Sequence, residues 1–511
     1  MEKERQPEVR TGRGAVRGRV EDGIAVFRGI PYARPPFGAL RFAAPEPAER
    51  WDGVRPALEF GPPPPQFDRM SPRPVTDAGD PAPDCLTVNV WSPALGSAAA
   101  LPVMVWFHGG AYVFGSAADP VYDGARLARR DVVVVTFNYR VGMEGFGQLA
   151  GAPANRGLLD QIAALRWVRE NIAAFGGDRD DVTLFGESAG AGSIAALLAM
   201  PAAAGLFHQA VAQSVPGSYF APELASRIAG AVGARVGAGA TARDLREVDP
   251  HRLVRAADEV FAARGDHARE WGAVAHAETV FSPVVDGESL PCTPWEAVAR
   301  GDARELALVF GHNRDEYRLF MAKRGEFGSV SGERAEQALR VFGPGGGSRG
   351  SGRSAWSAYR GAYPGAGPEE LYETVMSDWM CRMPTVRLLE AQVAAGGVAY
   401  AYELRWSAPV SGGRLGACHG LDVPLVFGTL DAPLARQMLG EEAPAAAGAL
   451  SERMQAAWAE FALHGDPGWP GYRAADRLSK VFDCEDALLG DPVAASRKVW
   501  RNHSFTALEP R

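Results

Sequence analysis

A short apolar run that ends in a glycine turn places the strongest constraint on the fold. Residues 182–185 read Val-Thr-Leu-Phe, and the turn Gly-Glu-Ser-Ala-Gly follows directly at 186–190. An alanine-rich apolar segment continues from 189 to 200, where Pro201 ends it. This order predicts a buried strand, a sharp turn with Ser188 at its tip, and a helix. A strand that feeds a helix in this way is typical of an α/β protein.

Ser188 is the candidate nucleophile. A serine hydroxyl attacks poorly at neutral pH, so it needs a base and nearby backbone amides, and a strained strand-to-helix turn brings both within reach. The pattern G-x-S-x-G alone is weak, because 60 glycines in 511 residues produce it by chance on the order of a few tenths of a time. A second match at 346–350 lies in a glycine-rich segment without flanking strand or helix patterns, which predicts a surface loop. The flanking patterns therefore select Ser188, where a Cβ at Gly186 or Gly190 would crowd the turn.

Strand and helix patterns alternate along the rest of the chain. Helical patterns lie between the later strands, the clearest from 155 to 174, which predicts a parallel sheet with crossover helices. The predicted strands are 16–20, 24–29, 86–91, 103–107, 132–137, 182–185, 209–214 and 306–310. With 47% apolar residues, the chain is able to bury one large core. We therefore predict a single domain over residues 1–511, with flexible loops near 62–83 and 343–354.

Charge and cysteine content exclude several classes of function. The formal net charge is −8 and no long basic cluster stands out, so nucleic acid is not an expected partner. No window holds about 18 uninterrupted apolar residues, and the charged N-terminus lacks the apolar core of a signal peptide. No membrane contact and a cytoplasmic location are therefore expected. The five cysteines lack metal-ligand spacing and are expected to be free buried thiols without a metal; they are Cys85, Cys292, Cys381, Cys418 and Cys484.

A second glycine turn follows the strand predicted at 103–107. The sequence His-Gly-Gly-Ala-Tyr at 108–112 is able to aim consecutive backbone amides at one point, where acyl transfer develops negative charge on the carbonyl oxygen. We predict an oxyanion hole formed by the amides of Gly110, Ala111 and Ala189, the last directly after the nucleophile. A turn with a purely structural role is the alternative.

The base is expected among the histidines that follow Ser188, and the acid at a strand end before that base. His419 is favoured because it lies in a loop of small residues, Gly-Ala-Cys-His-Gly at 416–420, that is able to approach the turn. The other candidates are His208, His251, His267, His276, His312, His464 and His503. The last predicted strand is followed by two adjacent carboxylates, Asp315 and Glu316, and their spacing does not choose between them.

With these residues and several further blocks, the chain resembles the type-B carboxylesterases, the cholinesterase-like branch of the α/β-hydrolases, and in particular their bacterial para-nitrobenzyl esterase members. Residues 175–190 fit the family's serine signature, and 84–93 resemble its second signature. Other matching blocks are 29–33, 36–38, 41–42, 138–142, 157–161 and 281–287. The resemblance covers essentially the whole chain. It implies an α/β-hydrolase fold with a mostly parallel central sheet, helices on both faces and an antiparallel N-terminal strand region.

The resemblance also implies a role for individual positions. It implies Ser188 as the nucleophile and His419 as the base. For the acid it favours Glu316 over Asp315, and it implies the same oxyanion hole. Glu187, beside the nucleophile, resembles a carboxylate that lines the site, with a plain turn position as the alternative. Two residues resemble an internal salt bridge of the family, whose loss strands a buried charge; they are Arg140 and Asp160.

The chain departs from the family pattern at several places. Where the family has a carboxylate that pairs with the arginine matching Arg41, this chain has Pro83, so that ion pair is expected to be absent. The disulfide of the extracellular members is expected to be absent as well, because the partner position of Cys85 holds no cysteine. The glycine that commonly follows the acid is Tyr317, and the usual Gln-Ser-Gly is Gln-Ser-Val at 213–215. The local shape of the site is therefore expected to differ.

Together these features predict a serine carboxylesterase that acts on a small-molecule ester through an acyl-enzyme intermediate, without a cofactor. Hydrolysis of amides or carbamates by the same residues is one alternative, and a non-catalytic interaction module is the alternative from another class. Because the histidine base must be neutral and its reference pKa is about 6.5, activity is expected to decline in mildly acidic buffer. The sequence assigns neither the acyl and alcohol preference nor the oligomeric state.

Overall fold

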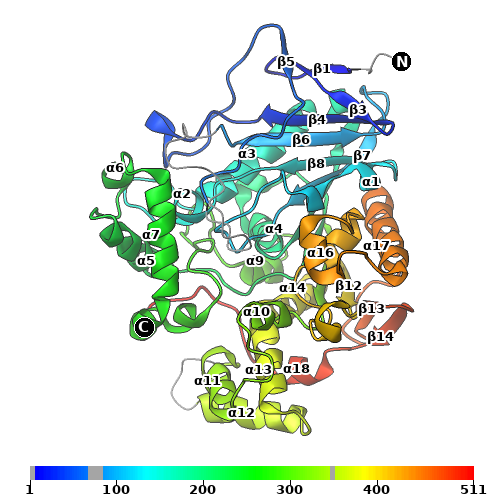
Figure 1. Cartoon of the computed structure of the whole chain (residues 1–511). Helices are drawn as coiled ribbons and strands as arrows, with labels where there is room; N and C mark the ends of the chain where they lie inside the picture. Colours follow the sequence, from blue (N-terminus) through cyan, green and yellow to red (C-terminus); the bar gives the residue numbers. More distant parts are fainter. Residues whose placement is uncertain (1–5, 67–83, 346–350) are drawn as a thin grey trace.

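One large twisted sheet organises the chain. The computed structural model describes residues 6–66, 84–345 and 351–511. Within them, eleven strands form a sheet in the order β14-β13-β12-β11-β10-β9-β7-β8-β6-β4-β3, and three form a smaller sheet in the order β1-β2-β5. Figure 1 shows the large sheet running from the blue N-terminal strands to the red β14. The strands from β13 to β8 pair in parallel, and the pairs at both edges are antiparallel.

The strands agree closely with those expected from the sequence. Their bounds are β1 Glu8–Arg10, β2 Ala15–Arg17, β3 Arg19–Glu21, β4 Ile24–Pro31, β5 Val54–Pro56, β6 Thr87–Ser92, β7 Leu101–Phe107, β8 Val133–Phe137, β9 Gly177–Glu187, β10 Gln209–Gln213, β11 Ala307–Asn313, β12 Val398–Leu404, β13 Leu478–Phe482 and β14 Ala487–Gly490. The strand expected at 16–20 is instead two strands, because β2 belongs to the small sheet and β3 to the large one. The sequence analysis missed the last three strands and the short strands β1 and β5.

Helices cover both faces of the large sheet. Their bounds are α1 Ala125–Ala128, α2 Gly142–Phe146, α3 Arg156–Asn171, α4 Ala189–Ala199, α5 Pro222–Arg235, α6 Ala242–Leu245, α7 Pro250–Ala262, α8 Ala268–Trp271, α9 Pro294–Arg300, α10 Arg318–Lys323, α11 Gly332–Phe342, α12 Ser351–Ala362, α13 Pro368–Ser377, α14 Met383–Ala394, α15 Asp422–Phe427, α16 Pro433–Leu439, α17 Ala445–His464 and α18 Ala494–Val499. The helix expected at 155–174 is α3 followed by a short 3₁₀ turn.

The two faces of the sheet form two separate apolar cores, as the period-two alternation of a strand requires. In β7, Val103, Val105 and Phe107 pack into the core beneath α3, α4, α5 and α14. Met104 and Trp106 point the other way, into the core covered by α1, α15, α16 and α17. Burial on both faces explains why the central strands are apolar throughout. The expected α/β-hydrolase architecture is therefore confirmed.

Two expected loops have different outcomes. Most of the loop expected near 62–83 lies outside the described residues. Its first part, 62–66, is described and forms neither helix nor strand. The loop expected at 343–354 is shorter than that, because α12 begins at Ser351. The apolar side of this helix buries Ala355 and Tyr359, and this packing overrides the glycine and serine content. The second serine pattern at 346–350 lies outside the described residues.

The sequence predicted five free, buried cysteines and no membrane-spanning segment, and the structure allows both expectations to be compared with the described residues. All five cysteines are free; Cys85, Cys381 and Cys418 are buried, whereas Cys292 is half-buried and Cys484 is exposed. The expectation that all five are buried is therefore wrong for the last two. Within the described part of the chain, none of the helices has the length and apolar character needed to span a bilayer.

Candidate active site

Ser188 sits on the sharp turn between β9 and α4. Its backbone has φ 55° and ψ −123°, a strained conformation for a residue with a side chain. A Cβ at Gly190 would lie 1.9 Å from the carbonyl oxygen of Phe107, and one at Gly186 would lie 2.8 Å from the same atom. The expected crowding of the turn is thus confirmed. The Ser188 amide donates to the carbonyl of Gln213, 2.9 Å away, which ties the turn to β10.

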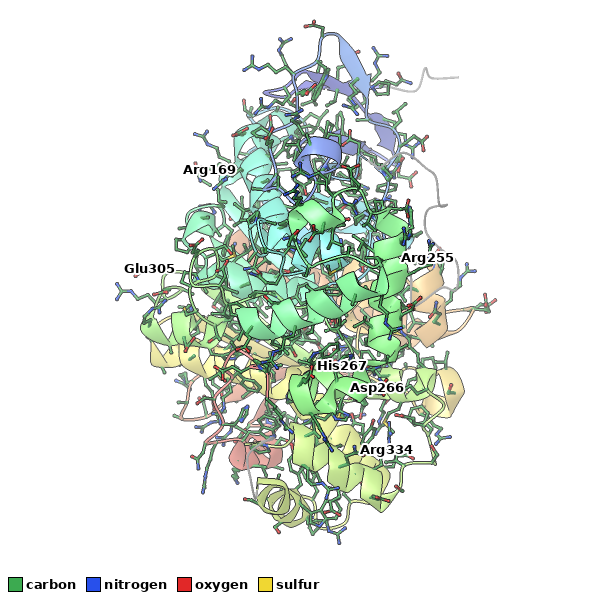
Figure 2. The ribbon with its side chains drawn as sticks, turned by 90° about the vertical axis from the view of Figure 1, so that its left-hand side faces the viewer. Arg169, Arg255, Asp266, His267, Glu305 and Arg334 are labelled. Atoms are coloured by element: carbon green, nitrogen blue, oxygen red, sulfur yellow. The ribbon has the colours of Figure 1, made fainter. Side chains whose placement is uncertain are left out.

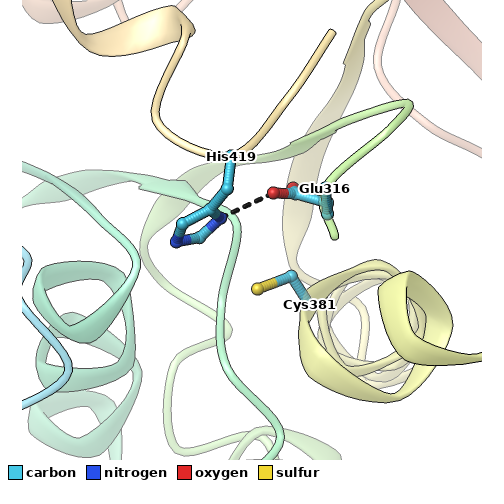
Figure 3. A group of neighbouring side chains, drawn as sticks. All are labelled: Glu316, Cys381 and His419. Carbon is cyan, nitrogen blue, oxygen red and sulfur yellow. Dashed lines mark hydrogen bonds and ion pairs between the residues drawn. The ribbon is translucent and has the colours of Figure 1, made fainter. Parts of the chain in front are cut away.

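Ser188, His419 and Glu316 form one continuous chain of hydrogen bonds. The Ser188 Oγ lies 2.9 Å from His419 Nε2. On the other side of the ring, Nδ1 lies 2.6 Å from Glu316 Oε2, the contact drawn as a dashed line in Figure 3. Since a carboxylate only accepts, Nδ1 carries the proton and Nε2 is free to accept the serine proton. The structure thus brings together three residues that are far apart in the sequence.

The structure separates the two carboxylates that follow β11. Asp315 turns away from the histidine, accepts the amide of Ala417 at 2.8 Å and pairs with Arg314 and Arg318. Glu316 faces His419, and its carboxylate is fully buried. Only Glu316 is therefore placed to orient the imidazole.

Three hydrogen bonds hold the Glu316 carboxylate. Besides His419, the hydroxyl of Ser214 donates to Oε1 at 2.6 Å, and the amide of Asn313 donates to it at 2.9 Å. Burial alone would raise the pKa of Glu316, but the charge and hydrogen bond of His419 and these two donors lower it below 4.5. The carboxylate therefore stays ionised at neutral pH. The sequence analysis did not identify Ser214 or Asn313 as supports of the acid.

A second carboxylate reaches the same imidazole. Glu187 Oε1 lies 3.1 Å from His419 Nε2, yet it makes no hydrogen bond among the described residues. Burial raises the pKa of Glu187, and the charge of His419 opposes this rise. Burial lowers the pKa of His419, but Glu187 and Glu316 outweigh that effect and raise this pKa well above 6.5. The structure thus places Glu187 in the site, beside the nitrogen that contacts Ser188.

The glycine loop after β7 adopts the backbone shape expected for an anion-binding turn. Gly110, Ala111 and Tyr112 all have positive φ, at 111°, 53° and 62°. Within the described chain, the amides of Gly110, Ala111 and Ala189 have no acceptor. The hydroxyl of Thr279 donates to the Ala111 carbonyl at 2.8 Å and so anchors the loop. Unpaired amides on a strained, anchored loop are able to receive a developing oxyanion.

The catalytic groups open into a cavity of about 760 Å³. Its lining includes Glu187, Ser188, Ala189 and His419, together with the glycine loop. Its walls include apolar side chains such as Phe114, Tyr122, Leu319, Phe320, Trp379 and Met438. A cavity of this size and character suits an apolar organic molecule with a few polar groups.

One group of side chains in the described chain has the donor types and spacing to hold a metal. Donor atoms of Glu316, Cys381 and His419 all lie within 4.8 Å of one another, as Figure 3 illustrates. The Cys381 thiol comes from a π-helical turn, Asp378–Arg382, and burial raises its pKa to about 12. A metal would have to displace that proton and the one shared by His419 and Glu316. The arrangement therefore fits proton transfer better than metal binding.

Two buried ion pairs support the loops around the site. Arg140 and Asp160 are both fully buried and make a bidentate contact at 2.8 and 2.7 Å. Arg41, expected to lack its family partner, pairs instead with the buried Glu144 at 2.6 Å. Pro83 lies outside the described residues. The arginine thus keeps a carboxylate partner, but from α2.

The departures at Tyr317 and Val215 also have structural consequences. The Tyr317 hydroxyl donates to Glu278, a residue that lines the cavity. The Val215 amide donates to the Thr385 hydroxyl at 3.0 Å, so this segment is anchored to α14. Tyr317 therefore contacts a residue of the cavity wall, while the effect of the two departures on the shape of the site stays a prediction.

The sheet order, the strained serine turn and the positions of acid and histidine define this protein as an α/β-hydrolase. The carboxylesterase family model matches residues 5–482. The para-nitrobenzyl esterase of Bacillus subtilis is 37% identical over 501 residues, which cover 96% of this chain and 97% of that protein. The phenmedipham hydrolase of Pseudarthrobacter oxydans is 34% identical, with 96% and 97% covered.

Solved structures agree with these relatives. A para-nitrobenzyl esterase structure superposes with a TM-score of 0.82 at 36% identity and covers 97% of this chain and 99% of its own. A carboxylesterase of Geobacillus stearothermophilus superposes with a TM-score of 0.82 at 34% identity, with 96% and 99% covered. The chain belongs to the carboxylesterase family and is a carboxylic ester hydrolase.

Proposed function

We propose that the protein hydrolyses small-molecule carboxylic esters in two steps through an acyl-enzyme on Ser188. The observation that carries the proposal is the unbroken contact from Ser188 Oγ through His419 to Glu316, at 2.9 and 2.6 Å. In this proposal Ser188 is the nucleophile, His419 the base and Glu316 the acid that orients the base.

In the first step, His419 Nε2 takes the serine proton while Oγ attacks the ester carbonyl. The negative charge that develops on the carbonyl oxygen is received by the amides of Gly110, Ala111 and Ala189. Loss of one such donor typically costs about 10²- to 10³-fold in rate, so the loop would supply a large share of catalysis. The protonated His419 then gives its proton to the leaving alcohol, and the C–O bond breaks.

In the second step, water replaces the alcohol. The water attacks the carbonyl carbon of the acyl-enzyme while His419 takes its proton, and the same amides receive the negative charge. The bond to Ser188 Oγ then breaks, His419 returns the proton to Oγ, and the carboxylic acid leaves. Glu316 stays ionised throughout and stabilises the imidazolium form in both steps. No cofactor takes part in this sequence.

A panel of substrates tests the proposal against its alternatives. Native protein and Ser188→Ala are compared on para-nitrophenyl esters of graded acyl length, a para-nitroanilide and a carbamate. We expect Ser188-dependent turnover of the esters, with little on the anilide. Faster turnover of the anilide or carbamate would reassign the substrate class, and no Ser188-dependent turnover on any of them would favour a non-catalytic module.

The location and domain organisation are also proposals. We infer a reducing, cytoplasmic compartment, which five free cysteines support. We also infer that residues 1–511 form one domain, since the eleven-stranded sheet draws on segments from β3 to β14. Quantitative thiol labelling of freshly isolated protein tests the first inference, and a single cooperative unfolding transition tests the second.

A further inference from the structure

Arg264 places a guanidinium on the cavity wall that forms no ion pair with a carboxylate of the described residues. It belongs to the 3₁₀ turn Arg264–His267 that follows α7, and it lines the cavity that contains Ser188. Its Nε donates to the Ala277 carbonyl at 2.9 Å and its Nη1 to the Phe261 carbonyl at 2.7 Å. Its Nη2 donates to no atom in the described part of the chain. Two main-chain carbonyls thus fix the side chain and leave one face of the guanidinium uncommitted.

The carboxylates of the cavity are engaged elsewhere. Glu278 accepts two contacts of 2.6 Å from Arg324 Nη2 and a third hydrogen bond from the Tyr317 hydroxyl. Glu187 lies against His419. Asp119 accepts the amide of Val121 at 3.0 Å. Across the described residues, none of these carboxylates forms an ion pair with Arg264, although the negative charge of Glu278 is close enough to oppose the effect of burial on the pKa of Arg264.

The Arg264 guanidinium is also partly shielded from solvent. Its carbon lies 4.0 Å from the centre of the Phe261 ring, which covers one face. Burial lowers the pKa of Arg264, but an arginine stays charged at neutral pH. A fixed cation with an apolar backing and a free donor is a ready site for a carboxylate, because charge-assisted hydrogen bonds strengthen when water is partly excluded.

We propose that Arg264 selects esters that carry an anionic group, with a carboxylate on the substrate occupying the free face of its guanidinium. This inference rests on the proposed ester hydrolysis at Ser188 and adds the class of ester. The wall near Arg264 continues into residues Ala277 to Thr279, and Thr279 anchors the oxyanion loop through Ala111. The anionic group sits at the acyl or the alcohol end of the ester, and the experiment separates the two.

Two matched pairs of substrates provide the test. The mono-para-nitrophenyl ester of hexanedioic acid against para-nitrophenyl hexanoate puts the charge at the acyl end. Para-hexanoyloxybenzoate against its methyl ester puts the charge at the alcohol end. In one pair, Arg264→Met is expected to lower kcat/KM on the anionic member about tenfold relative to the neutral one.

Arg255→Met is the control variant. Arg255 lies on α7, is exposed and projects from the surface in Figure 2. We expect it to leave both ratios within about twofold, as is usual for an exposed charge. If Arg264→Met lowers both members of each pair equally, or changes neither, the inference is overturned.

The salt dependence of the wild-type enzyme gives a second test, which does not require that a variant folds. The ratio of kcat/KM for the anionic and neutral members is expected to fall severalfold when sodium chloride is raised to about 0.5 M, because salt screens the attraction. A ratio that does not respond to salt in either pair overturns the inference. Absence of turnover on all four esters rejects the proposed hydrolysis itself, whereas turnover with no Arg264 effect on either ratio rejects only the selectivity.

Discussion

Two of the buried charge clusters in the described chain differ in one respect. Around Arg140 and Asp160, every carboxylate oxygen accepts a hydrogen bond, and the remaining guanidinium nitrogen donates to the Ala43 carbonyl. Around His419, Glu187 Oε1 lies 3.1 Å from Nε2 without forming a hydrogen bond. The first cluster is saturated, meaning that each of its carboxylate oxygens accepts a hydrogen bond. The second is unsaturated, because one carboxylate oxygen accepts none from the described residues.

The difference shows how burial serves two purposes. A saturated pair offsets the desolvation of its charges and locks neighbouring loops, so removing one partner is costly to stability. An unsaturated cluster keeps carboxylates close enough to shift the pKa of an imidazole, which is what a general base needs. The same chemistry thus stabilises the fold in one place and prepares a reaction in the other.

The largest expected effect is at Glu316. In Glu316→Gln, the side-chain amide donates to Nδ1 and forces the proton onto Nε2, which then cannot accept from Ser188. We expect kcat to fall about 10³- to 10⁴-fold, while the free energy of unfolding falls by less than about 1.5 kcal/mol, since Ser214 and Asn313 keep an acceptor. Steady-state kinetics and urea unfolding measure the two quantities. A loss of stability as large as that at Asp160 would remove the contrast between the clusters.

The next effect concerns the saturated pair. Asp160→Ala leaves the Arg140 guanidinium buried without its partner, so the free energy of unfolding is expected to fall by about 3–5 kcal/mol. Glu46→Ala, which breaks the exposed pair with Arg34, is the control and is expected to cost less than about 1 kcal/mol. Urea unfolding at neutral pH measures both. Equal, small costs would show that the Arg140 pair has no special structural weight.

A pH profile sharpens the comparison at Glu187. The base is active when neutral, and the carboxylates of Glu187 and Glu316 raise the pKa of His419, so the acid limb of kcat/KM is expected above pH 6.5. Glu187→Gln removes the carboxylate 3.1 Å from Nε2 and is expected to move this limb to lower pH, with kcat lowered less than about tenfold. An unmoved limb would mean that Glu187 does not act on His419.

The smallest expected effect is at Ser214. Ser214→Ala removes one of the hydrogen bonds to Glu316, so kcat is expected to fall roughly fivefold, the scale of one hydrogen bond. The double variant with Glu316→Gln tests whether Ser214 acts on the reaction through Glu316. If Ser214 acts through Glu316, its effect disappears in that background. An undiminished effect would place Ser214 outside the proposed proton path.

The sequence by itself determined the serine turn, the central strands and the glycine loop. These features depend on local rules: Gly190 approaches the Phe107 carbonyl so closely that no side chain fits, and the apolar run before it fills both faces of the sheet. The family membership followed from such local blocks. The late strands β12, β13 and β14 were missed, although Val398, Tyr400 and Tyr402 give β12 a pattern typical of a strand. β13 and β14 are short, with five and four residues, and carry a weaker local signal.

The tertiary structure decided which side chains meet. Asp315 and Glu316 are neighbours of equal charge, and only the packing of the loop at 415–419 turns one toward Arg318 and the other toward His419. The same holds for Arg41, whose partner came from α2. Pairing between distant segments depends on how they pack, and that information is spread over the whole core rather than written beside any one residue.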